Sequence, residues 1–286
     1  MPVRSKRKFS LLLRPSPLPG FGLSLGFTVT YLSAIVLLPL AAIMMRGLGG
    51  GWGIFVHAIG TPRVFAACRV TLESALLAAG FSAAFGFLVA WVLARYRFPG
   101  RSIVDALIDL PFALPTAVAG ISLTMLYAQN GWIGRYLEPH NIHIAFTRWG
   151  IILAMSFVGS PFVVRTVQPV LEDLDRSMEE AATSLGATPW QVFTRVLLPV
   201  CLPALVTGTA LAFARAAGEY GSVIFIAGNM PMKTEIAALL IVTKLEEYDY
   251  EGAAAIAVAM LVLSLSIMLV LNVVQSRMLR REGKRG

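Results

Sequence analysis

Long apolar runs separated by short polar connections dominate the chain. Six runs are long enough to cross a hydrocarbon core of about 30 Å, which takes roughly 20 apolar residues in a helix. They lie at about 22–45, 70–94, 106–127, 150–170, 200–226 and 252–274. Backbone groups have no water partner in lipid, so such runs form helices or a closed barrel, and these lack the two-residue alternation of a barrel. The pattern predicts an all-α polytopic membrane protein with six transmembrane helices.

Composition agrees with this class. Hydrophobic residues make up 57% and charged residues 14% of the 286 residues, against about 45–50% and about 25% in soluble domains. The two cysteines, Cys68 and Cys201, fall near opposite faces of the predicted membrane, so we expect unpaired, small apolar packing residues. No internal repeat is present, which predicts one membrane domain (22–274) between a basic N-terminal segment (1–21) and a basic tail (275–286).

Lys and Arg are unevenly divided between the two sets of connections. One set carries fifteen of them: Arg4, Lys6, Arg7, Lys8, Arg14, Arg95, Arg97, Arg101, Arg176, Arg195, Arg277, Arg280, Arg281, Lys284 and Arg285. The other set carries seven: Arg46, Arg63, Arg69, Arg135, Arg148, Lys233 and Lys244. Because positively charged connections stay inside, the first set and both termini are predicted to be cytoplasmic, in a multi-pass protein of the inner (plasma) membrane. The net charge of +8 is therefore explained by membrane topology and lipid contact and not by a nucleic-acid partner. The basic N-terminal segment lacks the small-residue cleavage site of a secretion signal.

The connection 171–199 carries the signals of a helical hairpin. Ser177 and Glu180 have the S-x-x-E spacing of a capping box, and Gly186 suits the left-handed residue that ends a helix. Thr188 begins a second capping sequence, T-P-W-Q, with proline at the favoured first helical position. The sequence predicts two short helices joined at a glycine.

This predicted hairpin has two interpretations. Ala181, Ala182 and Leu185 form a small apolar face beside several acidic residues. Such a face fits a groove on a partner protein, in the way that an amphipathic helix does. The alternative is a surface connection that only links two spans.

A longer string decides between them. "EAATSLGATPWQVFTRVLLP" resembles the EAA loop of the permease subunits of ABC importers, with Val where Ile is more usual. The matching positions are Glu180, Ala181, Ala182, Gly186, Val196, Leu198 and Pro199. The resemblance implies a type I ABC-importer permease fold, in which the loop 171–199 couples the membrane helices to a separate ATPase through Glu180, Ala181, Ala182, Gly186 and Pro199.

The chain lacks the motifs of an energy-converting or metal enzyme. No G-x-x-x-x-G-K-[ST] sequence occurs, and the single Gly-Lys pair, at Gly283, is followed by Arg. There is no HExxH or paired-Cys site, and we expect His140 and His143 to be solvated. We therefore predict a non-catalytic permease with no cofactor of its own, ATP and Mg²⁺ being bound by the partner ATPase.

Two charged residues fall within the fifth apolar run. Arg215 and Glu219 are four residues apart, on one helical face, and ionisable groups at membrane depth face the protein interior or a wet cavity. They are either a structural ion pair or part of an anion route, with Glu219 holding Arg215 until a gate moves. Gly208, Ala212 and Ala216 form a ridge of small residues that permits close helix contacts.

The third run is interrupted. Pro111 and Pro115 in "DLPFALPTAVAGISL" remove helix hydrogen bonds, with Gly120 beyond them, and broken helices line transport cavities. Together with Asn229, which ends "FARAAGEYGSVIFIAGN", they complete the predicted pathway. For Arg165, in the fourth run, we favour snorkelling to the inner surface over burial.

"ALPTAVAG" and the stretch from "GEYG" to "IMLVLN" resemble the CysT type of sulfate/thiosulfate permease over essentially the whole chain. The resemblance implies four kinds of partner: a CysW-type second permease, two copies of a CysA-type ATPase, a soluble sulfate- or thiosulfate-binding protein and membrane lipid. A molybdate/tungstate permease is the alternative within the class. Two alternatives lie outside this class. One is an ion-coupled secondary anion transporter. The other is an intramembrane enzyme using Arg215, Glu219 and Asp109, but no nucleophile–base pair or metal-ligand spacing supports an enzyme.

The connection 228–249 contains one more predicted element. Thr234 is placed to cap a short, mostly apolar helix with Glu235 in its first turn. This helix either covers the outer mouth and meets the binding protein, or only seals the bundle at the membrane surface.

Overall fold

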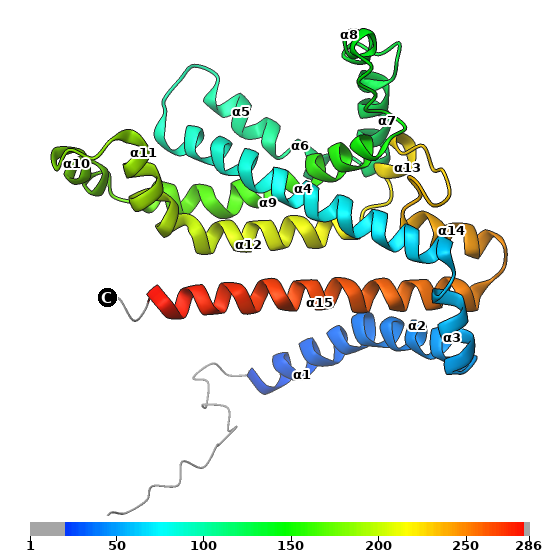
Figure 1. Ribbon diagram of the computed structural model, residues 1–286. Helices are drawn as coiled ribbons and strands as arrows, with labels where there is room; N and C mark the ends of the chain where they lie inside the picture. The colour runs from blue at the N-terminus through cyan, green and yellow to red at the C-terminus, as the bar shows by residue number, and fades with distance from the viewer. Residues whose placement is uncertain (1–20, 283–286) are drawn as a thin grey trace, which may run out of the picture.

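The computed structural model describes residues 21–282, where helices are joined by turns and loops and no strand occurs (Figure 1). The predicted N-terminal segment 1–21 lies outside the described residues except for Phe21, as do the last four residues of the tail. The first half contains α1 (Phe21–Leu32), a π-helical turn η1 (Ser33–Leu37), α2 (Leu38–Gly49), α3 (Trp52–Ile59), α4 (Pro62–Arg95), α5 (Arg101–Ile108), α6 (Leu110–Ala113), α7 (Thr116–Tyr127), α8 (Gly134–Leu137) and the 3₁₀ turn η2 (Glu138–His140). The second half contains α9 (Arg148–Asp173), α10 (Ser177–Ser184), α11 (Pro189–Val192), the π-helical turn η3 (Phe193–Leu197), α12 (Leu198–Ala217), α13 (Val223–Ile226), α14 (Ala237–Glu246) and α15 (Tyr250–Glu282).

Helices α4, α9 and α12 form the core of the bundle. Glycines bring their backbones together: a Cβ added at Gly86 would lie 2.8 Å from Val163 Cβ, and one at Gly208 would lie 2.9 Å from Val163 Cα. The predicted ridge on α12 is confirmed, because Gly208, Ala212 and Ala216 are all buried. Close backbone approach supplies the van der Waals contact that holds helices together in lipid.

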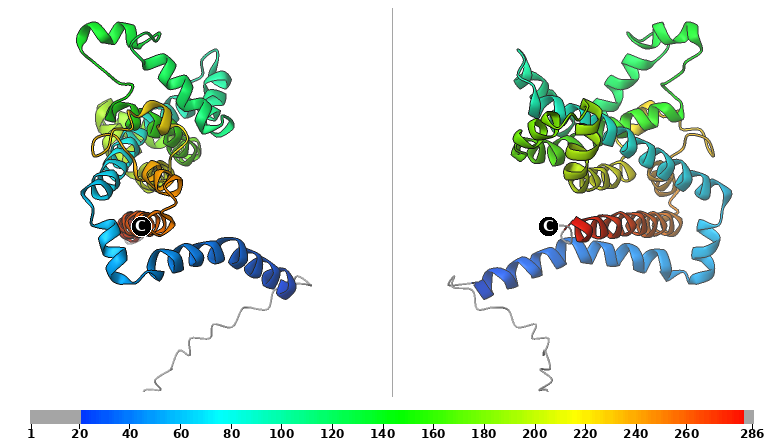
Figure 2. Two further views of the ribbon diagram at one scale, coloured as in Figure 1. Left: turned by 90° about the vertical axis from the view of Figure 1, so that its right-hand side faces the viewer. Right: turned by 60° about the vertical axis from the view of Figure 1, so that its left-hand side comes forward.

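A second layer is built on α15. Helix α15 packs against α12 on one side and against α2 on the other, where Gly47 allows the backbone of Ala254 to approach. Helix α14 fits between α4 and α15, with Leu240 buried against Val64 and Ile256. In Figures 1 and 2 helix α1 diverges from α15, and the segment Gly22–Gly49 has no buried residue in its most apolar window.

Five helical segments of the described chain are long and apolar enough to cross a membrane: Gly22–Gly49, Pro62–Arg95, Arg148–Asp173, Pro189–Ala217 and Tyr250–Val273. The predicted third span, 106–127, is divided among α5, α6 and α7. Pro111 occupies the first turn of α6 and Pro115 precedes α7, so the prolines break the run as the sequence predicts. The exact count of six spans stays a prediction.

Two predicted boundaries are wrong. The fifth span does not continue to residue 226, because α12 ends at Ala217 and a turn through Gly218 separates it from α13. The helix predicted after Thr234 begins three residues later, at Ala237, and Thr234 instead accepts a hydrogen bond from the backbone N–H of Met230. Glu235 precedes this helix and forms a bidentate ion pair with Arg63, 2.7 Å at the shorter contact.

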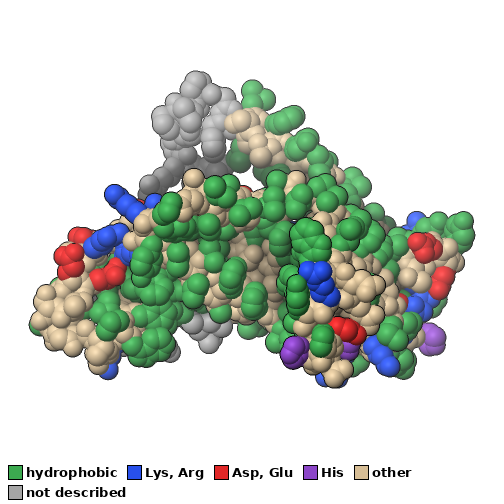
Figure 3. Space-filling view, turned by 90° about the horizontal axis from the view of Figure 1, so that it is seen from above, with side chains coloured by type: hydrophobic (Ala, Val, Ile, Leu, Met, Phe, Trp, Pro, Cys, Tyr) green, Lys and Arg blue, Asp and Glu red, His purple; other side chains and the backbone are tan. Residues whose placement is uncertain are grey.

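The helix ends gather at two poles. One pole, called the hairpin end, has α10, α11, the first turn of α5 and the last turns of α15; the opposite pole, called the far end, has α3, α13 and α14 (Figure 1). On the face drawn in Figure 3, charged side chains lie toward these two ends, and hydrophobic side chains cover the surface between them. This division of charge is compatible with the predicted topology, which stays a prediction.

Candidate functional site

The connection at the hairpin end folds as two short helices, which we call the hairpin (Ser177–Val192). Helix α10 ends before Gly186, whose φ of +86° is the predicted left-handed conformation. Thr188 caps α11 with the predicted capping box: its hydroxyl accepts the N–H of Gln191, and the Gln191 side chain accepts the N–H of Thr188. The chain then continues without a break through η3 into α12. The hairpin is thus joined directly to a core helix.

The first predicted capping box is wrong. Ser177 is the first residue of α10, and its N–H donates to Asp175 Oδ1 at 2.9 Å. Asp175 lies two residues earlier, where an aspartate forms a local turn with the backbone more readily than serine does. The hydrogen bonds from the backbone and hydroxyl of Ser177 lower the pKa of the Asp175 carboxyl below its usual value.

The residues predicted to couple to a partner lie on the surface of the connection 171–199. Glu180, Ala181, Gly186 and Pro199 are exposed, and Ala182 is half-buried. Two large apolar side chains share this surface: Leu185 is 89% exposed and Trp190 is 70% exposed. Large apolar side chains gathered with charged residues on a projecting element are typical of protein interaction sites.

At the far end of α12, the predicted ion pair is present. Arg215 Nη1 lies 2.6 Å from Glu219 Oε2, and the Glu219 side chain is only 1% exposed, against 34% for Arg215. The other carboxylate oxygen, Oε1, accepts the N–H and the hydroxyl of Ser222, each at 2.9 Å. The pair spans the end of α12 instead of lying within a continuous helix, because the turn at Gly218 intervenes.

Helix α7 packs against this same turn. A Cβ added at Gly120 would lie 2.7 Å from Ser222 Cα, and Gly221 is in equally close contact with the Thr116 side chain. Of the predicted pathway residues, Pro115 and Gly120 therefore belong to the helix that meets the Arg215–Glu219 turn. Pro111 lies in α6, which has no buried residue.

Asn229 lies in the loop after α13. Its side-chain N–H donates to Ile224 O at 2.9 Å, and its Oδ1 is buried without a hydrogen bond. Asn229 has a φ of +51°, which an asparagine tolerates better than most residues. Its hydrogen bond is made with the preceding helix α13, not with the Arg215–Glu219 pair.

The Arg165 side chain is 33% exposed and is held by two aspartates, and its snorkelling stays a prediction. Its Nε and Nη2 donate to the two carboxylate oxygens of Asp109, at 2.9 and 2.6 Å. Nη1 donates to Asp105 Oδ1 at 2.7 Å and to Gln168 Oε1 at 3.1 Å, and Nη2 also donates to Asp105 O. All five N–H groups of the guanidinium are used, so α5 and α6 are fastened to α9. Asp105 and Asp109 are four residues apart in the sequence, but nothing near them in the sequence identifies Arg165 as their partner.

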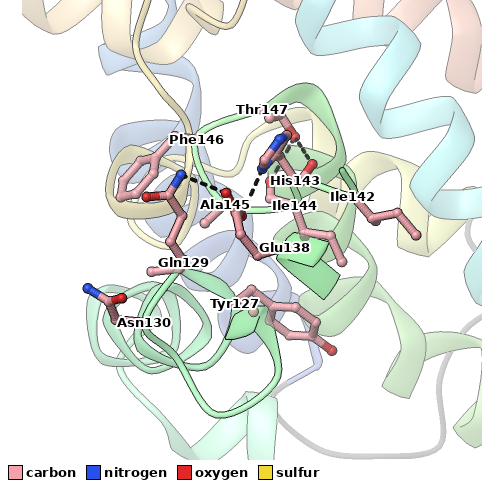
Figure 4. Close-up of a pocket in the computed structure, with 12 residues that line it drawn as sticks. Tyr127, Gln129, Asn130, Glu138, Ile142, His143, Ile144, Ala145, Phe146 and Thr147 are labelled. Carbon is pink, nitrogen blue, oxygen red and sulfur yellow. Dashed lines mark hydrogen bonds and ion pairs between the residues drawn. The ribbon is translucent and has the colours of Figure 1, made fainter. Parts of the chain in front are cut away.

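Beside the connection between α7 and α9 lies a cavity of about 520 Å³ (Figure 4). Glu138 is its central charge: it pairs with His143 Nδ1 at 3.1 Å and accepts from Gln129 at 3.1 Å. The second histidine, His140, has its Nδ1 3.2 Å from Tyr136 O. Within residues 21–282, no group of three or more metal-ligating side chains gathers here or elsewhere.

Known proteins match this chain over most of its length. A family model described as "Binding-protein-dependent transport system inner membrane component" matches residues 82–280. Proteins named "Sulfate transport system permease protein CysT" are similar over nearly the full length. The one from Escherichia coli is 52% identical over 264 residues, 92% of this chain and 95% of that protein. The one from Synechocystis is 49% identical over 253 residues, 87% of each.

Solved structures share the fold at lower identity. A bacterial ABC transporter involved in the import of alginate superposes with a TM-score of 0.75 at 18% identity, over 90% of this chain and 94% of the other. The methionine ABC transporter MetNI in an inward-facing conformation gives 0.54 at 18% identity, over 76% and 95%. The architecture is thus that of ABC-importer permeases.

The fastening of α5 by Arg165 can be tested by hydrogen exchange. Helix α5 has no buried residue, so replacing Arg165 with Gln should raise its amide exchange rate by about tenfold, as expected for local opening that loses one strong tie. The matched control is Arg101→Gln, since Arg101 makes one exposed ion pair with Glu172 at 3.3 Å and such pairs contribute little. Equal exchange in the two variants would contradict this role of Arg165.

Proposed function

The chain belongs to the family of binding-protein-dependent transport system inner membrane components, and we propose that it is the permease subunit of an ATP-driven importer of sulfate. It moves the anion inward by alternating access and performs no hydrolysis itself. The observation that carries this proposal is the hairpin, with its left-handed Gly186 and exposed Leu185, projecting from one end of an apolar bundle and continuous with α12. The choice of sulfate rests on the identity of about half of all residues with proteins named as sulfate permeases.

The remaining subunits follow from this assignment. A separate CysA-type ATPase, in two copies, binds ATP and Mg²⁺ and docks on the hairpin. A CysW-type permease completes the membrane part, and a soluble protein delivers sulfate or thiosulfate to the far end. A solved alginate transporter in complex with its periplasmic protein supports this general arrangement. The hairpin end then lies on the cytoplasmic side of the inner membrane, in agreement with its larger share of Lys and Arg.

The anion pathway runs past the turn where α7 meets α12. Arg215 keeps a third of its side chain exposed while Glu219 is buried beneath it, so the guanidinium offers N–H donors to a passing oxyanion. Pro115 and Gly120 shape the adjoining helix α7, and Pro111 and Asn229 lie at the borders of the pathway. Glu219 restrains Arg215, which keeps the attraction for the anion weak enough for release.

Isolation of the tagged chain in mild detergent tests the proposed function. We expect an ATPase and a second, non-identical permease to copurify, and the reconstituted assembly to take up labelled sulfate only with ATP and the binding protein. Preferential uptake of molybdate by a self-paired permease would favour the molybdate alternative. Uptake that continues without any ATPase would contradict the proposal.

Coupling through the hairpin predicts a loss of transport on replacing Gly186. A Cβ at Gly186 meets no neighbour, but valine is strained at a φ of +86°, so Gly186→Val should distort the hairpin without disturbing the membrane helices. We expect uptake to fall by at least about tenfold with normal membrane insertion. Gly100→Val is the matched control, because Gly100 has a φ of +87°, equally open surroundings and a place outside the hairpin. Comparable losses in both variants would show that strain alone, not the hairpin, impairs the protein.

The pathway predicts that Arg215 affects rate more than stability. Arg215→Gln should lower maximal sulfate uptake by about tenfold, equivalent to about 1.4 kcal/mol, and leave half-saturation unchanged, because the binding protein sets it. Arg69→Gln is the control, since Arg69 forms another pair at the same spacing, with Glu73, on the exposed surface. A folded Arg215→Gln protein with normal uptake would leave Arg215 a purely structural role.

A further inference from the structure

Arg95, the last residue of α4, lies where three helical elements meet at the hairpin end. Its Nη1 and Nη2 donate to the carbonyl oxygen of Leu174, the residue that follows α9, at 3.3 and 3.2 Å. Its Nη2 also lies 2.6 Å from Glu179 Oε1 on α10. In return, Arg176 donates to the carbonyl oxygen of Arg95 at 3.2 Å. One guanidinium thus joins the ends of α4 and α9 to α10, which is the first arm of the hairpin.

This cluster is more enclosed than the other charged groups of the hairpin. The Arg95 side chain is 10% exposed and that of Glu179 is 26% exposed. Enclosed pairs are screened less by salt and water than surface pairs are. Within residues 21–282, the Arg95–Glu179 pair is the one ion pair that joins α10 to a membrane-spanning helix.

Helix α4 is not adjacent to the hairpin in the sequence, because the hairpin follows α9 and leads into α12. The second arm, α11, leads directly into Phe193, whose ring lies 5.7 Å from that of Trp91 on α4. The first arm, which carries Glu180, Ala181 and Ala182, reaches α4 through Arg95. Both arms must therefore hold α4 for the hairpin and the core to move as one body.

The contact between Arg95 and Glu179 leaves one donor of the guanidinium unused. Arg95 Nε is buried without a hydrogen bond, although an arginine and a carboxylate can form two parallel hydrogen bonds. A small displacement of α10 along α4 would allow Nε to take part. A rearrangement of this kind would keep α10 attached to α4 while the hairpin shifts.

We propose that Arg95 is a positioning residue for transport, which makes α4 follow the first arm of the hairpin through Glu179 and Leu174. This inference rests on the proposed function, because the displacement comes from the ATPase. Arg95 itself touches neither the anion nor the nucleotide. Its loss should separate ATP hydrolysis from transport instead of abolishing both.

The test uses the complete importer, with both permeases, the ATPase and the binding protein, in proteoliposomes. Arg95→Gln and Glu179→Gln should each lower the amount of sulfate moved per ATP hydrolysed by about five- to tenfold, and the double variant should be no worse than either, as for two residues acting through one contact. Arg95→Lys should restore part of the coupling. The matched control is Arg97→Gln, an exposed arginine two residues further along, which should transport normally.

The readouts separate the two hypotheses. Normal sulfate per ATP in both single variants, or an equal loss in Arg97→Gln, would overturn the role of Arg95. Additive losses in the double variant would also contradict it, since they would place the residues in different contacts. If Arg95→Gln does not assemble, Glu179→Gln on the more exposed partner decides the question. Failure of the unaltered assembly to hydrolyse ATP would instead contradict the proposed function.

Discussion

The arrangement depends on close contact between the backbones of α4, α9 and α12. In lipid the hydrophobic effect gives little drive for one apolar helix to join another, so association relies on van der Waals packing and polar contacts. Gly86, Gly159 and Gly208 remove the side chains that would keep the three helices apart. Because the hairpin projects from one end of this core and the Arg215–Glu219 turn closes the other, a single packed unit connects them.

Charged residues secure the breaks in the bundle. Arg165 holds α5 and α6 on α9, Glu219 stabilises the turn after α12, and Arg95 fastens the hairpin to α4. At each break, backbone groups or ionised side chains lose regular helix partners, and in a water-poor environment an unpaired group is costly. The same breaks are where α7 meets α12 and where the hairpin begins, so the polar ties coincide with the proposed pathway and coupling surface.

The sequence predicts local features far better than contacts between distant residues. Gly186 and the capping box of Thr188 are identifiable because turn and cap chemistry involves residues within a few positions of one another. Ser177 was misassigned because Asp175 competes for the same N–H. The partners of Arg165 lie 56 and 60 residues earlier in the chain, so no local pattern shows them, and the Arg95–Glu179 contact escapes for the same reason. Hydropathy alone also passes over Gly218, since the residues beyond it are as apolar as those before.

The uninterrupted segment from Pro189 to Ala217 has a mechanical consequence. It contains 29 residues, which at 1.5 Å per residue amounts to roughly 43 Å. A rod of that length pivoting at its middle by about 10° swings each tip by roughly 4 Å, in opposite directions. A modest tilt imposed at the hairpin end therefore moves the opposite tip, beside the Arg215–Glu219 turn, by a distance comparable with the width of a small ion.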